Sequence, residues 1–525
     1  MDLLLRNADV YDGTGAPAQS VDVAVTGGRI SAIETRIDGA AAEIIDLTGL
    51  ALAPGFIDIH THSDVSLLHD PSGESKVRQG VTTEVVGNCG YSAFPVHPGR
   101  RSELTDHLAR LGDEPMPIGW TGFPQYAETM SEARPALNVA MLTGHSALRI
   151  SAMAEPYRPA NAEDVAAMAR LLDEALEAGA FGLSTGLTHT PSSFGDPAEV
   201  TALVRVCARH DAMYATHARI AAGREIDAID EAITTTRNAG GRLQFSHLAL
   251  NDPAWWGRAE RALARFDAAG IDAAFDVYPY DASSSAMLQY LPEWTQEGGG
   301  TLLRRHHRDP AWRERALADI RRGFLGGIPW YWERIVIVAA GDRTDLPGQS
   351  VAAVGEAWGC PPEEVLLDLC AELGSIVQVV LYYRTEADMT AFLAHPLAVV
   401  GSDGNAQPLR ERDDRPHPRA FGTFPRVLGR YVREQPVLGL AEAIRKMTAA
   451  PADRLKLGKR GRLLPGYAAD LVAFNPATVI DRATFDKPRQ APDGIRHTIV
   501  NGRFVVRDGI MTGERSGEVL RHASR

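Results

Sequence analysis

The chain has 525 residues, of which 45% are hydrophobic and 23% charged, and its formal net charge at pH 7 is −13. These proportions are typical of a soluble globular protein with a large core, and the acidic balance argues against nucleic acid as a partner. Because no run of about 18 apolar residues predicts a membrane span and the start lacks signal-peptide features, we expect a cytoplasmic protein.

Short strand-like segments separated by turns fill both ends of the chain. Residues 21–33 have the pattern of a strand, a Gly-Gly turn and a return strand, and residues 498–506 contain the strong turn pair Asn501-Gly502. Two β-rich ends around a different middle predict one small β-sandwich domain, built from residues 1–55 and 458–525.

Between residues 56 and 457, apolar strand-like runs alternate with longer helical patterns such as 161–178. This alternation predicts a parallel sheet, and the number of repeats fits an eight-stranded (β/α)8 TIM-like barrel. The strand-like runs include 80–86, 138–142, 213–216, 243–246, 273–277 and 397–400.

The alternation is interrupted from residue 283 to residue 345. This stretch is rich in arginine and tryptophan and contains Gly298-Gly299-Gly300. We interpret it as an inserted, lid-like segment that covers the mouth of the barrel.

Two histidines, His60 and His62, follow the apolar run that begins at Gly55. Alternate side chains of a strand point the same way, so both imidazoles can reach one metal ion. An isolated His-x-His pair also fits two unrelated histidines, but its place at the end of an apolar strand favours a metal site.

Three further polar residues end strand-like runs in the same manner: His217, His247 and Asp403. Barrel enzymes hold their catalytic groups at these strand ends. Each residue alone also fits a buried hydrogen-bonded side chain or a helix cap. Four histidines and an aspartate at the ends of four strands, however, together predict a metal centre.

The four cysteines are too few and too widely spaced for a disulfide framework, which fits a reducing compartment. Cys207, Cys360 and Cys370 lie in apolar, helix-like surroundings and are interpreted as buried small hydrophobes. Cys89 differs, because it lies directly after a strand, in the segment Gly87-Asn88-Cys89-Gly90.

The histidines and aspartate, in this chain order, resemble the amidohydrolase superfamily, and further segments resemble its D-aminoacylase (N-acyl-D-amino-acid deacylase) family. The resemblance extends from the first strand to the final residues. His-x-His is evidence for the superfamily only, whereas segment 417–431 is much more specific. The segments that carry the resemblance are 87–90, 184–187, 278–280, 401–404, 417–431 and 445–452.

The resemblance implies zinc-dependent hydrolysis of the amide bond of N-acyl amino acids, with D-enantiomers favoured and a small molecule as substrate. Asp403 would take a proton from the attacking water and return it to the leaving amine. The implied zinc ligands are Cys89, His217 and His247 at a tight site, and His60, His62, Cys89 and Asp403 at a possible second, weaker site.

The resemblance also assigns substrate contacts. An N-acyl amino acid carries a carboxylate, for which an arginine fork is a natural partner. Arg419 matches the family's carboxylate-binding arginine, although a surface arginine without substrate contact is the alternative. Tyr278 and Ser284 match residues that act beside it, and Tyr280 or His145 could assist the developing oxyanion.

Two positions depart from the family pattern. Ala249 replaces a lysine, and His189 replaces a tyrosine. In the relatives both positions hold the substrate carboxylate or orient its amide, so His189 is included among the substrate-binding candidates. These departures concern enantiomer preference, not the metal ligands.

Other activities fit the same metal residues. Hydrolysis of a cyclic amide of the hydantoin or dihydropyrimidine type is one alternative, and a D-dipeptidase is another. The lack of a lysine at a strand end, where cyclic amide hydrolases carry a metal-bridging lysine, counts against the first, and Ala249 counts mildly for it. A non-catalytic scaffold would not need the complete ligand set. Metal count and oligomeric state stay open.

Overall fold

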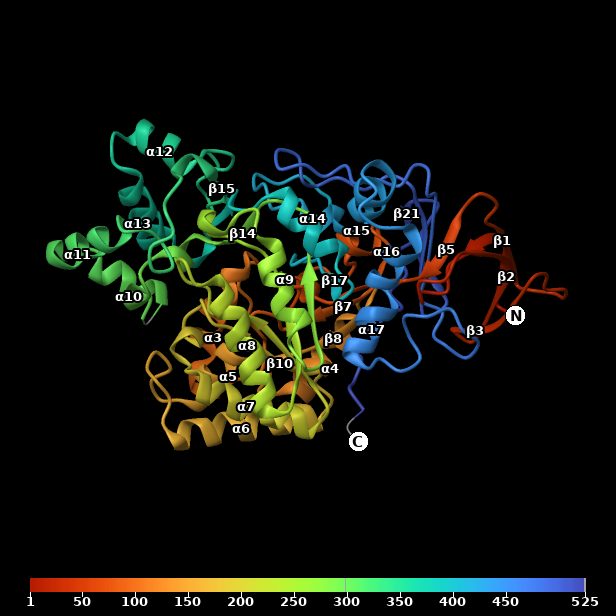
Figure 1. Ribbon diagram of the computed structural model, residues 1–525, viewed down its shortest axis with the longest axis horizontal. Helices are drawn as coiled ribbons and strands as arrows, with labels where there is room; N and C mark the ends of the chain where they lie inside the picture. Colours follow the sequence, from red (N-terminus) through yellow and green to blue (C-terminus); the bar gives the residue numbers. More distant parts are fainter. Residues whose placement is uncertain (298, 524–525) are drawn as a thin grey trace.

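The computed structural model describes residues 1–297 and 299–523 (Figure 1). Gly298, in the predicted lid, and residues 524–525, at the end of the predicted β-domain, lie outside the described residues. Along the longest axis, a helical subdomain with α10 to α13 lies at one end, the barrel in the middle and strands β1 to β3 at the other end (Figure 1).

Parallel strands form the central barrel, which confirms the predicted TIM-like fold class. β8 and β9 are separated by one residue and together make one of the eight positions in the described part of the chain. The first and last strands meet through hydrogen bonds from the Asp403 N–H to the His60 carbonyl (2.8 Å) and from the His62 N–H to the Gly404 carbonyl (3.4 Å). The strands are β6 (Phe56–Asp58), β7 (Val81–Val86), β8 (Asn138–Met141), β9 (Thr143–Gly144), β10 (Gly182–Gly186), β11 (Met213–His217), β12 (Arg242–Phe245), β13 (Ala273–Val277) and β17 (Ala398–Val400).

Helices surround the barrel. The longest, α6, is capped by Asn161, whose side chain forms a capping box with Asp164, and it buries Met168 and Leu172. No helix of the described chain combines the length and the apolar character that crossing a membrane requires. The helices of this part are α1 (Ser66–His69), α2 (Glu74–Val77), α3 (Arg101–Leu108), α4 (Phe123–Ala133), α5 (His145–Ala152), α6 (Ala162–Glu177), α7 (Pro197–Arg209), α8 (Glu225–Ala239), α9 (Ala259–Asp267), α14 (Glu386–Ala394), α15 (Arg419–Arg426), α16 (Leu440–Met447) and α17 (Ala449–Leu455).

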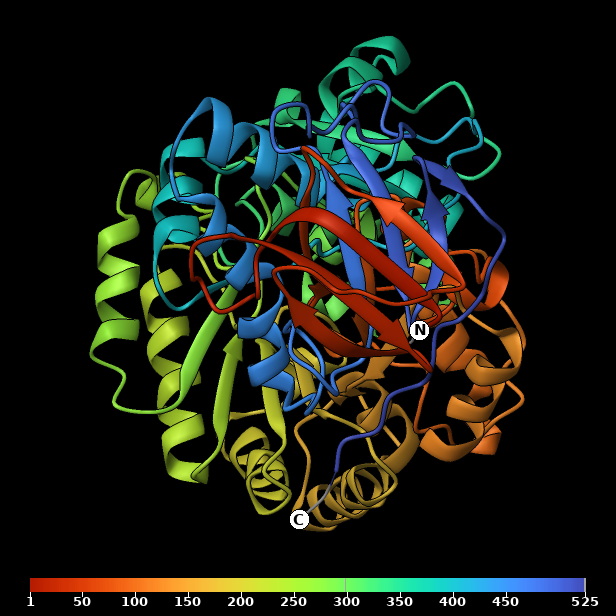
Figure 2. The same cartoon turned by 90° about the vertical axis from the view of Figure 1, so that its right-hand side faces the viewer.

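Both ends of the chain contribute to one mixed sheet (Figure 2). The predicted sandwich takes the form of a single continuous sheet, because β1 pairs with β2, β4 and β5, and its larger apolar cluster contains Leu5 and Val23. Asn501 (φ +49°) and Gly502 (φ +80°) form the predicted turn between β19 and β20. The strands are β1 (Leu3–Val10), β2 (Gln19–Thr26), β3 (Arg29–Glu34), β4 (Glu43–Asp46), β5 (Ala51–Pro54), β18 (Leu471–Phe474), β19 (Ile495–Val500), β20 (Arg503–Arg507) and β21 (Ile510–Met511).

The inserted segment forms a subdomain with its own hydrophobic core, which extends from Met287 to Tyr383. Its antiparallel sheet has the order β14-β16-β15, so the central strand follows residue 345 in sequence. We therefore propose to extend the insertion to residue 383; the other domain boundaries stay predictions. Its elements are β14 (Ser283–Ala286), α10 (Gly299–His306), α11 (Pro310–Ile320), β15 (Ile335–Ala339), α12 (Val351–Trp358), α13 (Pro362–Leu373) and β16 (Gln378–Leu381).

A buried lysine, Lys76, connects the first, second and last barrel strands. Its Nζ donates to the Asp58 carboxylate (2.9 Å), the Ser402 hydroxyl (2.7 Å) and the Gly404 carbonyl (2.9 Å), and lies 2.9 Å from Glu84. Lys76, Asp58 and Glu84 are 0% exposed, so the two carboxylates depend on this single cation for compensation.

Replacing the lysine should therefore destabilise the barrel. Lys76→Met leaves Asp58 and Glu84 buried without a cation, and we expect the free energy of unfolding to fall by about 3–5 kcal/mol. Urea unfolding followed by circular dichroism measures this change, with Lys487→Met, at an exposed position, as the control. Equal midpoints for the two variants would contradict the role assigned to Lys76.

Candidate metal centre

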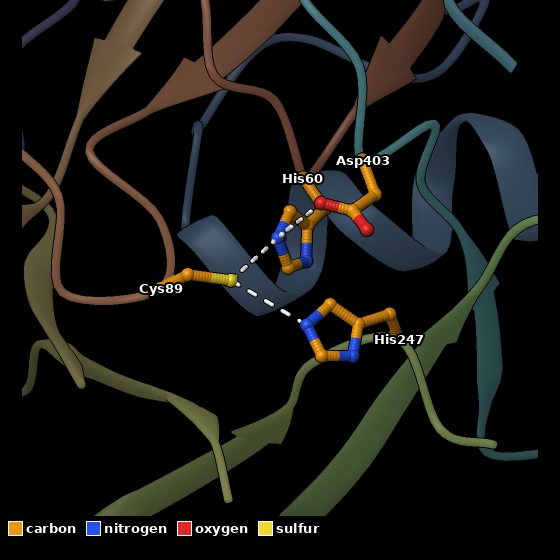
Figure 3. Close-up of side chains that lie close together, drawn as sticks. All are labelled: His60, Cys89, His247 and Asp403. Atoms are coloured by element: carbon orange, nitrogen blue, oxygen red, sulfur yellow. Dashed lines mark hydrogen bonds and ion pairs between the residues drawn. The ribbon is translucent and has the colours of Figure 1, made fainter. Parts of the chain in front are cut away.

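Four potential metal ligands converge at the mouth of the barrel (Figure 3). They are His60, Cys89, His247 and Asp403; all are buried, and their ligand atoms lie within 4.8 Å of one another. They follow β6, β7, β12 and β17, respectively. Parallel strands of a barrel end at the same face, which brings together residues distant in sequence.

The contacts inside this cluster are short. Cys89 Sγ lies 3.2 Å from His60 Nε2 and 3.5 Å from His247 Nε2, and Asp403 Oδ1 lies 3.4 Å from His60 Nε2. Thiolate sulfur, imidazole nitrogen and carboxylate oxygen are all donors that Zn²⁺ accepts. The donor set of this cluster therefore fits a zinc ion.

The other two predicted ligands border the cluster. His62 Nε2 lies 2.9 Å from Asp403 Oδ1. His217 Nε2 lies 2.6 Å from the Thr188 hydroxyl, and the His217 ring centroid lies 4.6 Å from that of His247. All six predicted metal residues thus lie at one place, while their division into a tight and a weaker site stays a prediction.

Neighbouring cationic groups set the pKa values of the two acidic groups in the cluster. Burial raises the pKa of the Cys89 thiol, but the neighbouring His60 and His247 outweigh burial and hold this pKa well below its usual value. Burial likewise raises the pKa of Asp403, and Arg419 together with the same two histidines holds it well below its usual value. A thiolate and a carboxylate thus face one space, an arrangement suited to a bound cation.

The backbone at the site is unusual. Cys89 (φ +53°), His247 (φ +37°) and Asp403 (φ +52°) adopt left-handed conformations, which cost free energy for residues with a Cβ. Such conformations cluster at functional sites, where the surrounding structure enforces them. The loops after β7, β12 and β17 are therefore shaped to direct these side chains inward.

The loop Asn88-Cys89-Gly90 packs closely against Ser184-Thr185-Gly186 at the end of β10. The Gly90 N–H donates to the Ser184 hydroxyl at 3.0 Å. A Cβ on Gly186 would lie 2.1 Å from the Cys89 carbonyl oxygen. Glycine at position 186 therefore lets the cysteine loop approach the end of β10.

Asp276 in β13 holds two of the clustered histidines and was not identified from the sequence. Its Oδ1 accepts from the His247 N–H (2.8 Å) and contacts His60 Nδ1 (2.9 Å), and its Oδ2 accepts from Gln244 (3.0 Å). The available signal was a carboxylate in the middle of an apolar strand. Outer-shell carboxylates of this kind orient metal-ligating histidines and fix their tautomer.

The cluster opens into a cavity of about 170 Å³. His189 lines it, and the His189 ring centroid lies 4.4 Å from that of His217. Burial holds the pKa of His189 well below its usual value, so this imidazole is neutral. The inserted subdomain supplies part of the wall, including Ser284, Tyr290, Phe324, Val338 and Tyr383.

Of the predicted substrate residues, Arg419 contacts both Ser284 and Tyr278 in this cavity. Arg419 Nη1 lies 2.7 Å from Asp403 Oδ2, and Nη2 donates to the Ser284 carbonyl at 3.2 Å. The guanidinium carbon of Arg419 lies 4.8 Å from the centroid of the Tyr278 ring. An arginine fork therefore lies directly beside the carboxylate at the metal cluster.

Tyr280 and His145, the two candidate aids to the oxyanion, lie outside the lining of this cavity. The Tyr280 hydroxyl donates to the Pro418 carbonyl at 3.4 Å, and Arg426 lies over its ring at 4.6 Å. His145 is 0% exposed and bonds to Glu199 at 2.7 Å. Neither is among the described residues that line the cavity, because each faces packed structure behind its wall.

The sequence pattern that defines the Amidohydrolase family matches residues 43–194 and 347–506 of this chain. The chain belongs to the amidohydrolase family. This amidohydrolase is 37% identical to N-acyl-D-glutamate deacylase of Alcaligenes xylosoxydans xylosoxydans, over 99% of this chain and 96% of the relative. It is 34% identical to D-aminoacylase of the same organism, over 99% of this chain and 97% of the relative.

A solved structure is similar throughout. N-acyl-D-glutamate deacylase of Bordetella bronchiseptica, complexed with zinc and a phosphonate mimic of the tetrahedral intermediate, matches with a TM-score of 0.84 and 34% identity. The match covers 99% of each chain. The predicted resemblance to the D-aminoacylase family is therefore confirmed.

The role of Asp276 can be tested through metal affinity. Asp276→Asn removes the charge that holds His60 and His247, and we expect the affinity for Zn²⁺ to fall about 10- to 100-fold. Competition with a fluorescent chelator measures the dissociation constant. Asp272→Asn, just before the opposite end of the same strand, is the control. Equal affinities of the two variants would exclude Asp276 as a ligand-positioning residue.

Proposed function

We propose that this protein is a zinc-dependent amidohydrolase that removes the acyl group from N-acyl-D-amino acids. The observation that carries the proposal is the buried thiolate–histidine–carboxylate cluster, which opens into a cavity with an arginine beside Asp403. The full-length similarity to two enzymes named for N-acyl-D-amino-acid hydrolysis supports it.

Six residues would hold the metal. Zinc, when bound, supplies a Lewis acid that polarises the scissile carbonyl and makes a nearby water more acidic. We assign Cys89, His217 and His247 to the tight site, and His60, His62 and Asp403, with Cys89 shared, to a weaker one.

Asp403 is proposed as the general base and acid. Its Oδ1 faces the histidines and its Oδ2 faces Arg419, at the junction of the cluster and the cavity. It accepts a proton from the attacking water as the C–O bond forms. When the C–N bond breaks, it returns the proton to the departing amine, so that a carboxylic acid and a free amino acid result.

Arg419 is proposed to bind the α-carboxylate of the substrate. Its contacts with Asp403, Ser284 and Tyr278 fix the guanidinium relative to the base. A carboxylate held there places the amide near Asp403, and such positioning contributes strongly to rate. His189, which lines the same cavity, is proposed to contact the amide.

The alternative activities receive less support. Hydrolysis of a cyclic amide and cleavage of D-dipeptides would use the same metal residues. Two relatives that match 99% of this chain at 37% and 34% identity are instead named N-acyl-D-glutamate deacylase and D-aminoacylase. A cytoplasmic location stays a prediction from composition and is consistent with four free cysteines.

Enantiomer preference tests the proposed reaction directly. We expect zinc-loaded protein to release amine from N-acetyl-D-amino acids and to leave the L-partners intact. Ninhydrin detection of paired D- and L-substrates measures this difference. Turnover of hydantoins with no release from either series would replace the proposal with the cyclic-amide alternative.

Asp403→Asn tests the proton-transfer step. The amide cannot accept the water proton, so we expect kcat to fall about 10²- to 10⁴-fold while the tight zinc is retained. Asp414→Asn is a matched control, because Asp414 lines the same cavity but pairs with Arg489 at 2.7 Å. A near-native rate for Asp403→Asn, with zinc content measured by atomic absorption, would remove this residue from the mechanism.

A further inference from the structure

Two arginines lie over one aromatic ring in the cavity wall. The guanidinium carbons of Arg419 and Arg384 lie 4.8 Å and 4.6 Å, respectively, from the centroid of the Tyr278 ring. Arg419 is paired with Asp403. In the described part of the chain, no carboxylate lies within ion-pair distance of Arg384. Its one side-chain hydrogen bond runs from Nε to the Asn251 side chain, at 3.1 Å.

The side chain of Asn251 fixes the position of the Arg384 guanidinium. Asn251, which orients its Nε, is itself fixed because its N–H donates to Glu225 at 2.6 Å. Burial raises the pKa of Glu225 to about 8, so this carboxyl group, which Asn251 separates from Arg384, is largely neutral at pH 7. Arg384 thus presents a positive charge to the cavity, which it lines, without a counter-ion among the described residues.

Another arginine of the cavity is less available. Arg110 is 5% exposed, and its Nη1 donates to both the carbonyl and the hydroxyl of Thr190 at 3.1 Å. Arg384 is half-buried and keeps its terminal nitrogens free of protein hydrogen bonds within the described residues. Beside it, Ala249 lines a small adjoining pocket and adds no charge.

The upper limit on the distance between the two guanidinium groups is compatible with a bound dicarboxylate. The central carbons of the two guanidinium groups lie 4.6 Å and 4.8 Å from the Tyr278 centroid, and their separation cannot exceed the sum of these two distances. The two carboxyl carbons of an extended aspartate or glutamate are about 4–5 Å apart, from three or four C–C bonds of about 1.5 Å. Each carboxylate can then reach one guanidinium through N–H···O bonds of about 2.8 Å.

We propose that Arg384 is a specificity-determining residue that binds the side-chain carboxylate of an acidic substrate. The substrate class is then N-acyl-D-glutamate or N-acyl-D-aspartate, with the α-carboxylate on Arg419. This inference rests on the proposed deacylase function. A half-buried cation with no carboxylate partner among the described residues disfavours neutral side chains, because their binding leaves its charge uncompensated.

Kinetics with matched substrates test the assignment. We expect the native enzyme to prefer N-acetyl-D-glutamate over N-acetyl-D-glutamine, which has the same shape without the charge. In Arg384→Gln, kcat/KM for the glutamate substrate should fall about 30-fold or more, while that for the glutamine substrate stays within about threefold. The control is Arg334→Gln, an exposed arginine also stacked on aromatic rings.

Two results would overturn the assignment. An equal loss of kcat/KM in Arg384→Gln on N-acetyl-D-glutamate, N-acetyl-D-glutamine and N-acetyl-D-leucine would mean that Arg384 does not bind the side-chain carboxylate. A native enzyme that does not distinguish glutamate from glutamine would exclude an acidic-substrate site altogether.

A binding measurement separates this inference from the proposed reaction. Calorimetry with glutarate, a dicarboxylate with no amide bond, should give a dissociation constant at least about 30-fold larger for Arg384→Gln than for the native protein. If native protein hydrolyses no N-acyl-D-amino acid but binds glutarate through Arg384, the deacylase proposal fails and the carboxylate site stands. Equal glutarate affinities would reject the site.

Discussion

The candidate metal centre depends on the contacts made by one buried carboxylate, that of Asp276. It lies inside the barrel on β13, and it contacts the His60 ring from one strand end and the His247 backbone from another. Because both contacts are buried, their strength is not reduced by competing water. Asp276 thus links the His60 ring to the backbone that carries His247, and both histidines contact Cys89.

The left-handed backbone conformations at the site cost free energy, which the packing of the surrounding barrel compensates. Left-handed conformations at Cys89, His247 and Asp403 direct three ligand side chains toward one space. The loop of Cys89 lies so close to β10 that only glycine fits at position 186. The Lys76 network holds β6, β7 and β17 together beneath these loops, so the fold and the site share one set of buried polar contacts.

The two sides of the cavity have different origins. The metal side is built from barrel strand ends, whereas much of the substrate side comes from the inserted subdomain and the segments that flank it. Arg384 directly follows this subdomain, and Ser284 lies on its first strand. This division lets the reaction stay constant while the insertion adjusts which substrates are accepted, as is common for barrels with variable loops.

Much of this protein was readable from the sequence. Alternating apolar runs predicted the barrel, and polar residues directly after those runs predicted His60, His62, His217, His247 and Asp403, because parallel strand ends must share one face. Cys89 required the family resemblance, since a lone cysteine between glycines has no periodicity to interpret. Only the tertiary structure decided which side chains meet across long distances in the chain.

Asp276, Lys76 and Arg384 contact residues far away in the chain, and sequence spacing carries no information about such contacts. For the same reason the sequence did not place Tyr280, whose hydroxyl donates to the Pro418 carbonyl and whose ring lies under Arg426 in the fold.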